Sequence, residues 1–152
     1  MWKHTAVALC LLAITTFAIP VEASTISTVE SKNREIACIA QAVYHEARGE
    51  HLEGMRAVGH VIVNRMVSSD NPTTACKVVN SPGQFTYNHR SKVTDWKSYN
   101  VALTVARMVY EGKDEDLTHG ATAFHVKHVR PSWDHKMIRV ATIGHQYFYK
   151  YA

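Results

Sequence analysis

The spacing of apolar residues changes along the chain, and this change limits the folds that the chain can adopt. In three segments between residue 35 and residue 110 the apolar positions recur every three or four residues, which is the period of one helix face. From residue 138 onward the pattern alternates, as it does along a strand. Helices that come before strands, with no strand–helix–strand repeat, predict an α+β domain that is mainly helical and ends in a small antiparallel hairpin or sheet.

Three segments carry the helical pattern. They span residues 35–48, 52–66 and 96–110. Because the connection between the first two is short, we expect these helices to pack side by side. The third segment has a second apolar side that includes Val101 and Met108, which predicts that this helix lies at the centre of the domain.

The rest of the domain divides into irregular chain and strands. Residues 70–94 contain helix breakers, with one helical turn predicted near residues 76–79, and loops of this length often carry function. Residues 138–143 and 147–149 are predicted to pair as a hairpin. Residues 121–128 are the candidate for a third strand.

Residues 1–23 are typical of a secretory signal peptide. Basic residues precede an apolar run over residues 5–19, and Ala23 marks the predicted cleavage site. The run is shorter than the roughly 20 residues that span a bilayer, and a retained membrane anchor is the alternative to cleavage. We expect a flexible lead-in over residues 24–34, a single domain over residues 35–152, and export to the periplasm or cell wall.

The charge balance indicates the class of partner. The chain carries a net charge of +4, a mild excess that suits a polyanionic partner. It has no basic stripe and no recognition helix, which argues against a nucleic acid. The charged run over residues 113–116 is predicted to be solvated.

The cysteines predict a disulfide bond. Because Cys10 lies in the leader, Cys38 and Cys76 form an even pair in an oxidising compartment. A bond between them would stabilise the fold by roughly 3 to 4 kcal/mol if it acts by restricting the unfolded chain. Two free thiols are the alternative, and a metal site is disfavoured because C-x-x-C spacing is absent.

Two glutamates on or near the first helix are candidates for acid–base chemistry. Glu46 lies at the margin of the apolar face, where partial loss of water favours the protonated carboxyl that a general acid needs. The alternative is a surface glutamate paired with Arg48 or Arg56. Glu50 would complete a two-carboxylate glycosidase site if the helix continued, but Gly49 leaves that geometry open.

The 10 histidines raise the question of a metal site. However, His45 and Glu46 are followed by Gly49 at the position where a zinc H-E-x-x-H helix needs its second histidine. His125 and His128 have a spacing that fits ligands and strand positions equally well. The G-x-S-x-G serine motif is also absent from the sequence. We therefore expect neither a metal nor another cofactor.

Several aromatic side chains lie in or beside the irregular segments. Rings that line a groove can pack against the faces of sugars, and the alternative for each ring is a place in the core. The residues concerned are Tyr44, Phe85, Tyr87, Phe124 and Trp133.

Five blocks of the chain form an ordered pattern over residues 38–150. They are Gln41-Ala-Val-Tyr-His-Glu-Ala-Arg-Gly-Glu50 with Glu53-Gly54, Val61-Ile-Val-Asn-Arg65, Gly83-Gln84-Phe85-Thr86, Gly120-Ala-Thr-Ala-Phe-His125 with Val129-Arg-Pro-Ser-Trp133, and Ile143-Gly144 with Phe148-Tyr149. This ordered set resembles the cell wall hydrolase family of the bacterial spore cortex-lytic enzymes.

The resemblance implies a lysozyme-like catalytic domain that cleaves peptidoglycan glycan strands between N-acetylmuramic acid and N-acetylglucosamine as a lytic transglycosylase. It assigns the acid and base role to Glu46. This residue would protonate the glycosidic oxygen and then, as a carboxylate, accept the proton of the muramic 6-hydroxyl. The product is a 1,6-anhydro sugar, and no second carboxylate is required.

The resemblance also implies a set of glycan contacts. The expected contacts are Tyr44, Glu50, Gln84, Phe85, His125 and Trp133. This sequence carries Ala123 and Phe124 where members of the family often carry His and Tyr.

We expect a monomer whose partner is peptidoglycan and whose contact with a membrane is limited to a retained leader. A muramidase that uses water, a non-catalytic wall-binding module and a metal-dependent amidase are the alternative functions. The sequence leaves open whether the protein is of bacterial or phage origin.

Overall fold

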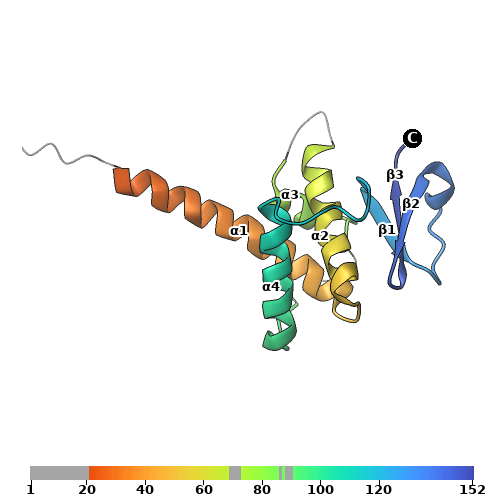
Figure 1. The fold of residues 1–152 in the computed structure, drawn as a ribbon, viewed down its shortest axis with the longest axis horizontal. Coiled ribbons are helices and arrows are strands. Elements are labelled where there is room, and N and C mark those ends of the chain that lie inside the picture. The colour runs from red at the N-terminus through yellow and green to blue at the C-terminus, as the bar shows by residue number, and fades with distance from the viewer. Residues whose placement is uncertain (1–20, 69–72, 86, 88–90) are drawn as a thin grey trace, which may run out of the picture.

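A computed structural model describes residues 21–68, 73–85, 87 and 91–152. Within these residues the helices come before the strands, as the change in apolar spacing predicts (Figure 1). The elements are α1 (Val21–Ala47), α2 (Leu52–Val67), α3 (Ala75–Asn80), α4 (Trp96–Tyr110), β1 (Ala123–Val126), β2 (Ile138–Ile143) and β3 (Gln146–Lys150), with a short 3₁₀ turn at Asp134–Lys136. The predicted α+β class, mainly helical with a small antiparallel sheet, is confirmed.

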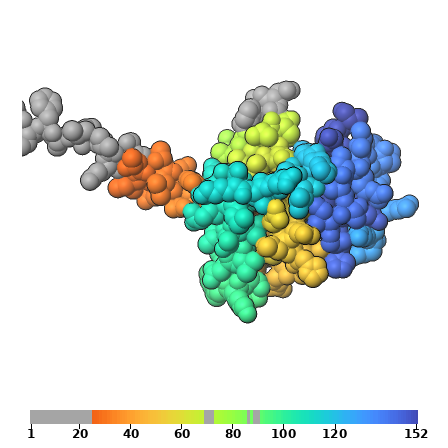
Figure 2. Space-filling model, in the orientation of Figure 1, coloured from red at the N-terminus to blue at the C-terminus, as the bar shows by residue number. Residues whose placement is uncertain are grey.

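The N-terminal part of α1 differs from the expected lead-in. Residues 24–34 are helical, and this part of α1 projects away from the rest of the molecule (Figures 1 and 2). Ile26 and Val29 are mostly exposed there. A helix that is already formed in the core extends at low cost, because each added residue gains one hydrogen bond without a new nucleation step. Most of the predicted signal peptide lies outside the described residues.

The second half of α1 anchors the helical core. Its apolar stripe, including Ile36, Ile39 and Val43, is almost completely buried, as the spacing predicts. α2 and α4 pack against this stripe and against each other. None of the described helices is both long enough and apolar enough to cross a lipid bilayer.

The central helix is α2 and not α4, so the expectation for residues 96–110 was wrong. Eight residues of α2 are buried because it packs on α1 and α4 and also contacts the sheet. α4 buries one side, while Val101 and Met108 on its other side are 44% and 40% exposed. The periodicity shows that a helix is apolar on two sides, but the partner that could cover the second side is set by the tertiary arrangement.

The predicted disulfide is confirmed. Cys38 in α1 is bonded to Cys76 in α3, across 38 positions of sequence. In the same place, the backbone N–H of Cys76 donates a hydrogen bond of 2.9 Å to the Glu35 carboxylate. α3 is the helical turn predicted near residues 76–79, and these two contacts hold it against α1.

The strands form an antiparallel sheet in the order β1-β3-β2. The predicted hairpin and the candidate third strand are therefore confirmed. Phe148 of β3 is fully buried against Ala57 and Val61 of α2, which fastens the sheet to the helices. Phe124 of β1 stacks on Phe148, with ring centroids 5.9 Å apart. The sheet thereby faces α2 and leaves a hollow beside it.

The charged run over residues 113–116 is only partly solvated, which corrects the sequence expectation. The side chain of Asp114 is 4% exposed and accepts hydrogen bonds from Arg56 (2.8 Å) and His60 (2.9 Å) of α2. Burial alone would raise the pKa of Asp114, but these hydrogen bonds outweigh burial and hold the pKa below its usual range. The sequence did not indicate that α2 would present two donors to this run.

Candidate active site

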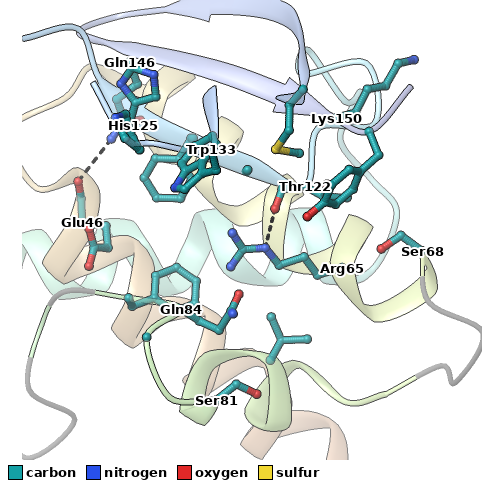
Figure 3. A pocket seen from close by; sticks show the side chains of 18 of the residues that line it. Glu46, Arg65, Ser68, Ser81, Gln84, Thr122, His125, Trp133, Gln146 and Lys150 are labelled. Atoms are coloured by element: carbon teal, nitrogen blue, oxygen red, sulfur yellow. Dashed lines mark hydrogen bonds between the residues drawn. The ribbon is translucent and has the colours of Figure 1, made fainter. Parts of the chain in front are cut away.

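A cavity of about 1230 Å³ lies between the helices and the sheet. Its walls come from the end of α1, from α2 and α3, from the chain after α3, and from β1 and β3 with the loop that follows β1. Figure 3 shows Glu46, Gln84, Arg65 and Trp133 around one shared space. Segments that are distant in the sequence therefore meet here.

Glu46 occupies the last turn of α1 at the edge of this cavity. The neighbouring Ala47 belongs to the buried stripe of α1, so the half-buried position of Glu46 follows from its place at the margin of that stripe. The side-chain amide of Gln146 in β3 donates a 3.5 Å hydrogen bond to the backbone oxygen of Glu46. This contact fastens the end of α1 to the sheet.

Two stacked rings lie beside Glu46. His45 and Tyr87 stack with their centroids 4.6 Å apart. Burial raises the pKa of Tyr87, and the charge of Glu46 raises it further. Burial also lowers the pKa of His45. Both rings are therefore uncharged at neutral pH, and neither provides a cation next to the Glu46 carboxyl.

Four of the predicted glycan contacts line the same cavity as Glu46. They are Gln84, Phe85, His125 and Trp133. Gln84 and Phe85 come from the irregular chain after α3, whereas the other two come from β1 and the loop after it. The structure thus brings together residues that the sequence places in separate blocks.

His125 supports the other rings of this wall. Its Nδ1 lies 2.8 Å from the backbone oxygen of Val126, and its Nε2 lies 2.9 Å from the hydroxyl of Tyr149. Its ring stacks on Tyr149 and meets Trp133 edge to face. Because both ring nitrogens are engaged, His125 holds Trp133 and Tyr149 in position and has no ring nitrogen left for a sugar.

Tyr44 is a predicted contact that the structure places elsewhere. Its side chain is 1% exposed and lies in the helical core, outside the cavity lining. The Tyr44 hydroxyl accepts hydrogen bonds from Arg48 (3.0 Å) and from the backbone N–H of Asp95 (3.1 Å). The hydrogen bond with Thr94, followed by the one from Asp95, lowers the pKa of Tyr44 to about 8. The hydroxyl of Tyr44 thus lies at the start of α4, where it contacts the backbone of Asp95, away from the cavity that contains Glu46.

Glu50 also lies outside the cavity lining. α1 ends at Ala47 and the chain turns at Gly49, so Glu50 does not share the face of Glu46. Its carboxylate accepts a 3.0 Å hydrogen bond from the backbone N–H of His145, in the turn between β2 and β3. Glu50 therefore fixes the hairpin turn, away from the cavity that contains Glu46.

The structure adds two residues that sequence reasoning missed. Gln146 is 1% exposed, and its side-chain oxygen is buried without a hydrogen-bond partner among the described residues. Arg65 of α2 also lines the cavity, and its buried Nη1 likewise has no hydrogen-bond partner among the described residues. The sequence pattern could have indicated both residues. Gln146 lies two residues before the buried Phe148 and therefore on the same face of β3. Arg65 comes shortly after the buried apolar residues of α2.

Among the described residues, His, Cys, Asp and Glu side chains do not gather in a group of three that could hold a metal ion. Glu46 is the single acidic residue among the described residues of the lining, which makes it the candidate for acid–base chemistry in this cavity. The rings and amides around it can bind a neutral, hydroxyl-rich ligand such as a sugar chain.

Comparison with known proteins connects this cavity to a family. Residues 49–149 match the cell wall hydrolase family. The spore cortex-lytic enzyme of Bacillus subtilis (strain 168) is 46% identical over 54 residues, which are 36% of this chain and 18% of that protein. The corresponding enzyme of Oceanobacillus iheyensis is 48% identical over 52 residues, 34% of this chain and 19% of that protein. The matches thus span about a fifth of these relatives.

Two solved structures have a similar fold. The catalytic domain of the Bacillus cereus SleB protein is 30% identical, with a TM-score of 0.62 over 76% of this chain and 89% of that domain. The catalytic domain of the germination-specific lytic transglycosylase SleB from Bacillus anthracis is 26% identical, with a TM-score of 0.60 over 76% and 93%. Glu46 lies three residues before the family match begins, so its role is argued from its place in the cavity.

Proposed function

Because the chain belongs to the cell wall hydrolase family, we propose that it cleaves the glycan strands of peptidoglycan between N-acetylmuramic acid and N-acetylglucosamine. One observation carries the proposal: Glu46 lies at the edge of a large cavity that is also lined by Phe85 and Trp133. Rings of this kind pack against sugar faces, and a carboxyl beside them can reach a glycosidic oxygen. The structural similarity to SleB catalytic domains supports the same class of substrate.

The reaction that we propose is lytic transglycosylation with Glu46 as acid and then base. The protonated carboxyl donates its proton to the glycosidic oxygen, and the bond from that oxygen to C1 of the muramic residue breaks. Positive charge develops at C1. The resulting Glu46 carboxylate accepts the proton of the 6-hydroxyl while that oxygen bonds to C1. The products are a 1,6-anhydro end and a free 4-hydroxyl, and Glu46 regains its proton.

The position of Glu50 favours this reaction over a two-carboxylate mechanism. A second carboxylate in the site would be needed to hold water or to act as a nucleophile. Glu50 is instead engaged at the turn between β2 and β3, with its carboxylate 3.0 Å from the backbone nitrogen of His145. A single carboxyl is sufficient when the substrate supplies its own hydroxyl as the nucleophile.

The proposal places the enzyme in the periplasm or the cell wall, where its substrate is found. The predicted signal peptide and the bond between Cys38 and Cys76 support this location, because such bonds persist in oxidising compartments.

Mass spectrometry of the soluble products released from purified sacculi tests the function. The protein should release anhydromuropeptides, the Glu46→Gln variant should release none, and the Glu53→Gln variant should behave like the unchanged protein. Glu53 is an exposed residue of α2 outside the cavity lining, so it controls for the loss of one negative charge. Release of the same products by Glu46→Gln would contradict the proposal, and cosedimentation without any product would favour a wall-binding module.

A further inference from the structure

The cavity contains a group of cations that the acid–base chemistry does not use. Arg65, Lys77 and Lys150 line it together with Glu46. Within the described part of the chain, none of these three cations forms an ion pair with a carboxylate. The described lining therefore has three positive side chains and one acidic side chain, and no described carboxylate is paired with any of the three.

Arg65 is the most constrained of the three cations. Its Nε donates a 2.5 Å hydrogen bond to the backbone oxygen of Thr122, and its guanidinium carbon lies 5.5 Å from the centre of the Phe85 ring. These contacts fix the plane of the guanidinium group. Figure 3 shows its terminal nitrogens directed into the cavity, toward the side on which Glu46 and Gln84 lie.

One outer nitrogen of Arg65, Nη1, lacks the hydrogen bond that a ligand can supply. Nη1 is buried and has no hydrogen-bond partner among the described residues. Burial lowers the pKa of Arg65, but a guanidinium group remains charged at neutral pH. Arg65 is half-buried and has no carboxylate partner among the described residues, a state that costs free energy. A ligand that brings a carboxylate reduces this cost through a charge-assisted hydrogen bond.

The glycan strand that we propose as the substrate carries its carboxylates on the muramic acid residues. Each muramic acid has a lactyl arm, which ends in its own carboxylate or carries a peptide stem with carboxylates further out. Neutral sugar rings and acetamido groups provide no such charge. The three cations fit this arm, because the guanidinium plane of Arg65 matches a carboxylate and exposed lysines add longer-range attraction.

On the basis of the proposed function, we propose that Arg65, assisted by Lys77 and Lys150, binds a carboxylate on the lactyl arm of a muramic residue. The cavity then has two separate tasks. Glu46 performs the bond cleavage at one side, and Arg65 selects strands that carry a charged arm. This assignment makes Arg65 a specificity residue that contacts the substrate.

Soluble tetrasaccharides of alternating N-acetylglucosamine and N-acetylmuramic acid test the assignment. Three forms are needed: free lactyl carboxylates, lactyl groups blocked as neutral methylamides, and lactyl groups carrying peptide stems. Calorimetry in the Glu46→Gln background gives the Kd of each form without turnover. Arg65→Gln should weaken binding of a charged form about tenfold to a hundredfold and change binding of the methylamide less than about twofold. The charged form that shows this loss identifies the source of the carboxylate.

Matched variants separate a binding role from a structural one. Lys97→Gln removes a positive charge from α4, outside the cavity lining, and should leave all three Kd values unchanged. If Arg65→Gln fails to fold, the double variant Lys77→Gln with Lys150→Gln replaces it, because both side chains are exposed. That double variant should reduce the preference for the charged forms by a smaller factor.

Binding to the tetrasaccharides and product release from sacculi together show whether the carboxylate site or the proposed cleavage is wrong. Equal losses on charged and neutral tetrasaccharides, or no preference for charge in the unchanged site, would overturn the assignment to Arg65. Anhydromuropeptide release from sacculi together with such a result leaves the proposed function intact. Charge-selective binding that depends on Arg65, without release of any product, supports the carboxylate site and overturns the proposed cleavage.

Discussion

The helical core and the cavity are built from different interactions. In the core, apolar side chains such as Ile39, Val58 and Val105 are at most 2% exposed and pack on one another. The cavity is held by single polar contacts between segments that are far apart in the chain, such as the one from Gln146 to the backbone of Glu46. We infer from this comparison that the apolar core determines the stability of the fold, whereas the polar residues of the cavity wall determine the activity of the protein.

Buried polar atoms without a hydrogen-bond partner also distinguish the cavity from the apolar core. Three buried atoms without a hydrogen-bond partner among the described residues belong to the cavity lining: Arg65 Nη1, Thr122 Oγ1 and Gln146 Oε1. Such groups cost free energy in the folded protein, so they are expected where a ligand completes them. We expect changes in the lining to alter activity more than stability, and changes at the contacts that join core and sheet to do the opposite.

Replacing each of the two candidate glutamates tests this distinction most strongly. Glu46→Gln should lower the cleavage rate by about a hundredfold to ten-thousandfold, because the general acid is lost. Its melting temperature should remain close to that of the unchanged protein. Glu50→Gln should instead lower the melting temperature, because the amide weakens the charge-assisted hydrogen bond to His145. A rate assay and a thermal scan on both variants are sufficient, and equal effects of the two on rate would contradict the distinction.

Removing the charge of Asp114 should be the largest change in stability. Asp114→Asn leaves Arg56 and His60 of α2 without their carboxylate, and we expect a loss of about 2 to 3 kcal/mol in the free energy of unfolding. Chemical denaturation measures this loss. Glu115→Gln is the matched control, because Glu115 is exposed in the same turn and its replacement should change stability by less than about 0.5 kcal/mol. A loss as large in the control would assign the effect to the charge of the turn as a whole.

The turn between β2 and β3 has little space for a side chain. A Cβ on Gly144 would clash with the Glu50 carboxylate, and the backbone there has a φ of +55°. Gly112 has a φ of +64° with nothing within 4 Å, so Gly112→Ala measures the conformational cost alone, about 1 kcal/mol. Gly144→Ala should cost about 2 kcal/mol or more, because it also displaces Glu50. Equal costs by denaturation would mean that the contact between Glu50 and the turn contributes nothing.

Acid should gradually weaken the contacts between α2 and the loop that follows α4. In this loop Asp114 accepts hydrogen bonds from Arg56 and His60, and Asp116 accepts one from Asn64. Burial acts to raise the pKa values of Asp114 and Asp116, but their hydrogen bonds lower both below the usual value for an aspartate. Their contribution is therefore complete above about pH 4, the value for an unfolded aspartate, and is lost as the pH falls through the lower folded values. Unfolding curves between pH 6 and pH 2 should show this decline, and the decline should be smaller in Asp114→Asn. An identical slope in that variant would exclude Asp114 as a source.

Local patterns were sufficient for most of the helical part and for the hairpin. The buried stripe of α1 follows from a period that is visible within one helix, and the pairing of β2 with β3 follows from alternation on either side of Gly144. The pairing of Cys38 with Cys76 could be predicted because the leader removes the third cysteine. The helix and hairpin patterns depend on residues that are close in the sequence, and the disulfide prediction depends on the number of cysteines outside the leader.

The features that could not be predicted depend on which segments meet in space. The burial of Asp114 requires donors from α2, and the engagement of Glu50 requires a backbone N–H 95 residues away. The periodicity of α4 could not show that the sheet would cover α2 instead. Arg65 belongs to the Val61–Arg65 block of the sequence, but only the assembled cavity shows that its buried Nη1 has no hydrogen-bond partner among the described residues.

Cleavage in water enriched in ¹⁸O shows which nucleophile completes the reaction at Glu46. With the 6-hydroxyl as the nucleophile, mass spectra of the products from sacculi should contain 1,6-anhydro muramic ends without ¹⁸O, and Glu46→Gln should yield neither these ends nor any others. Reducing muramic ends that carry one ¹⁸O would show that water attacks C1, and would contradict the single-carboxyl mechanism proposed for this cavity.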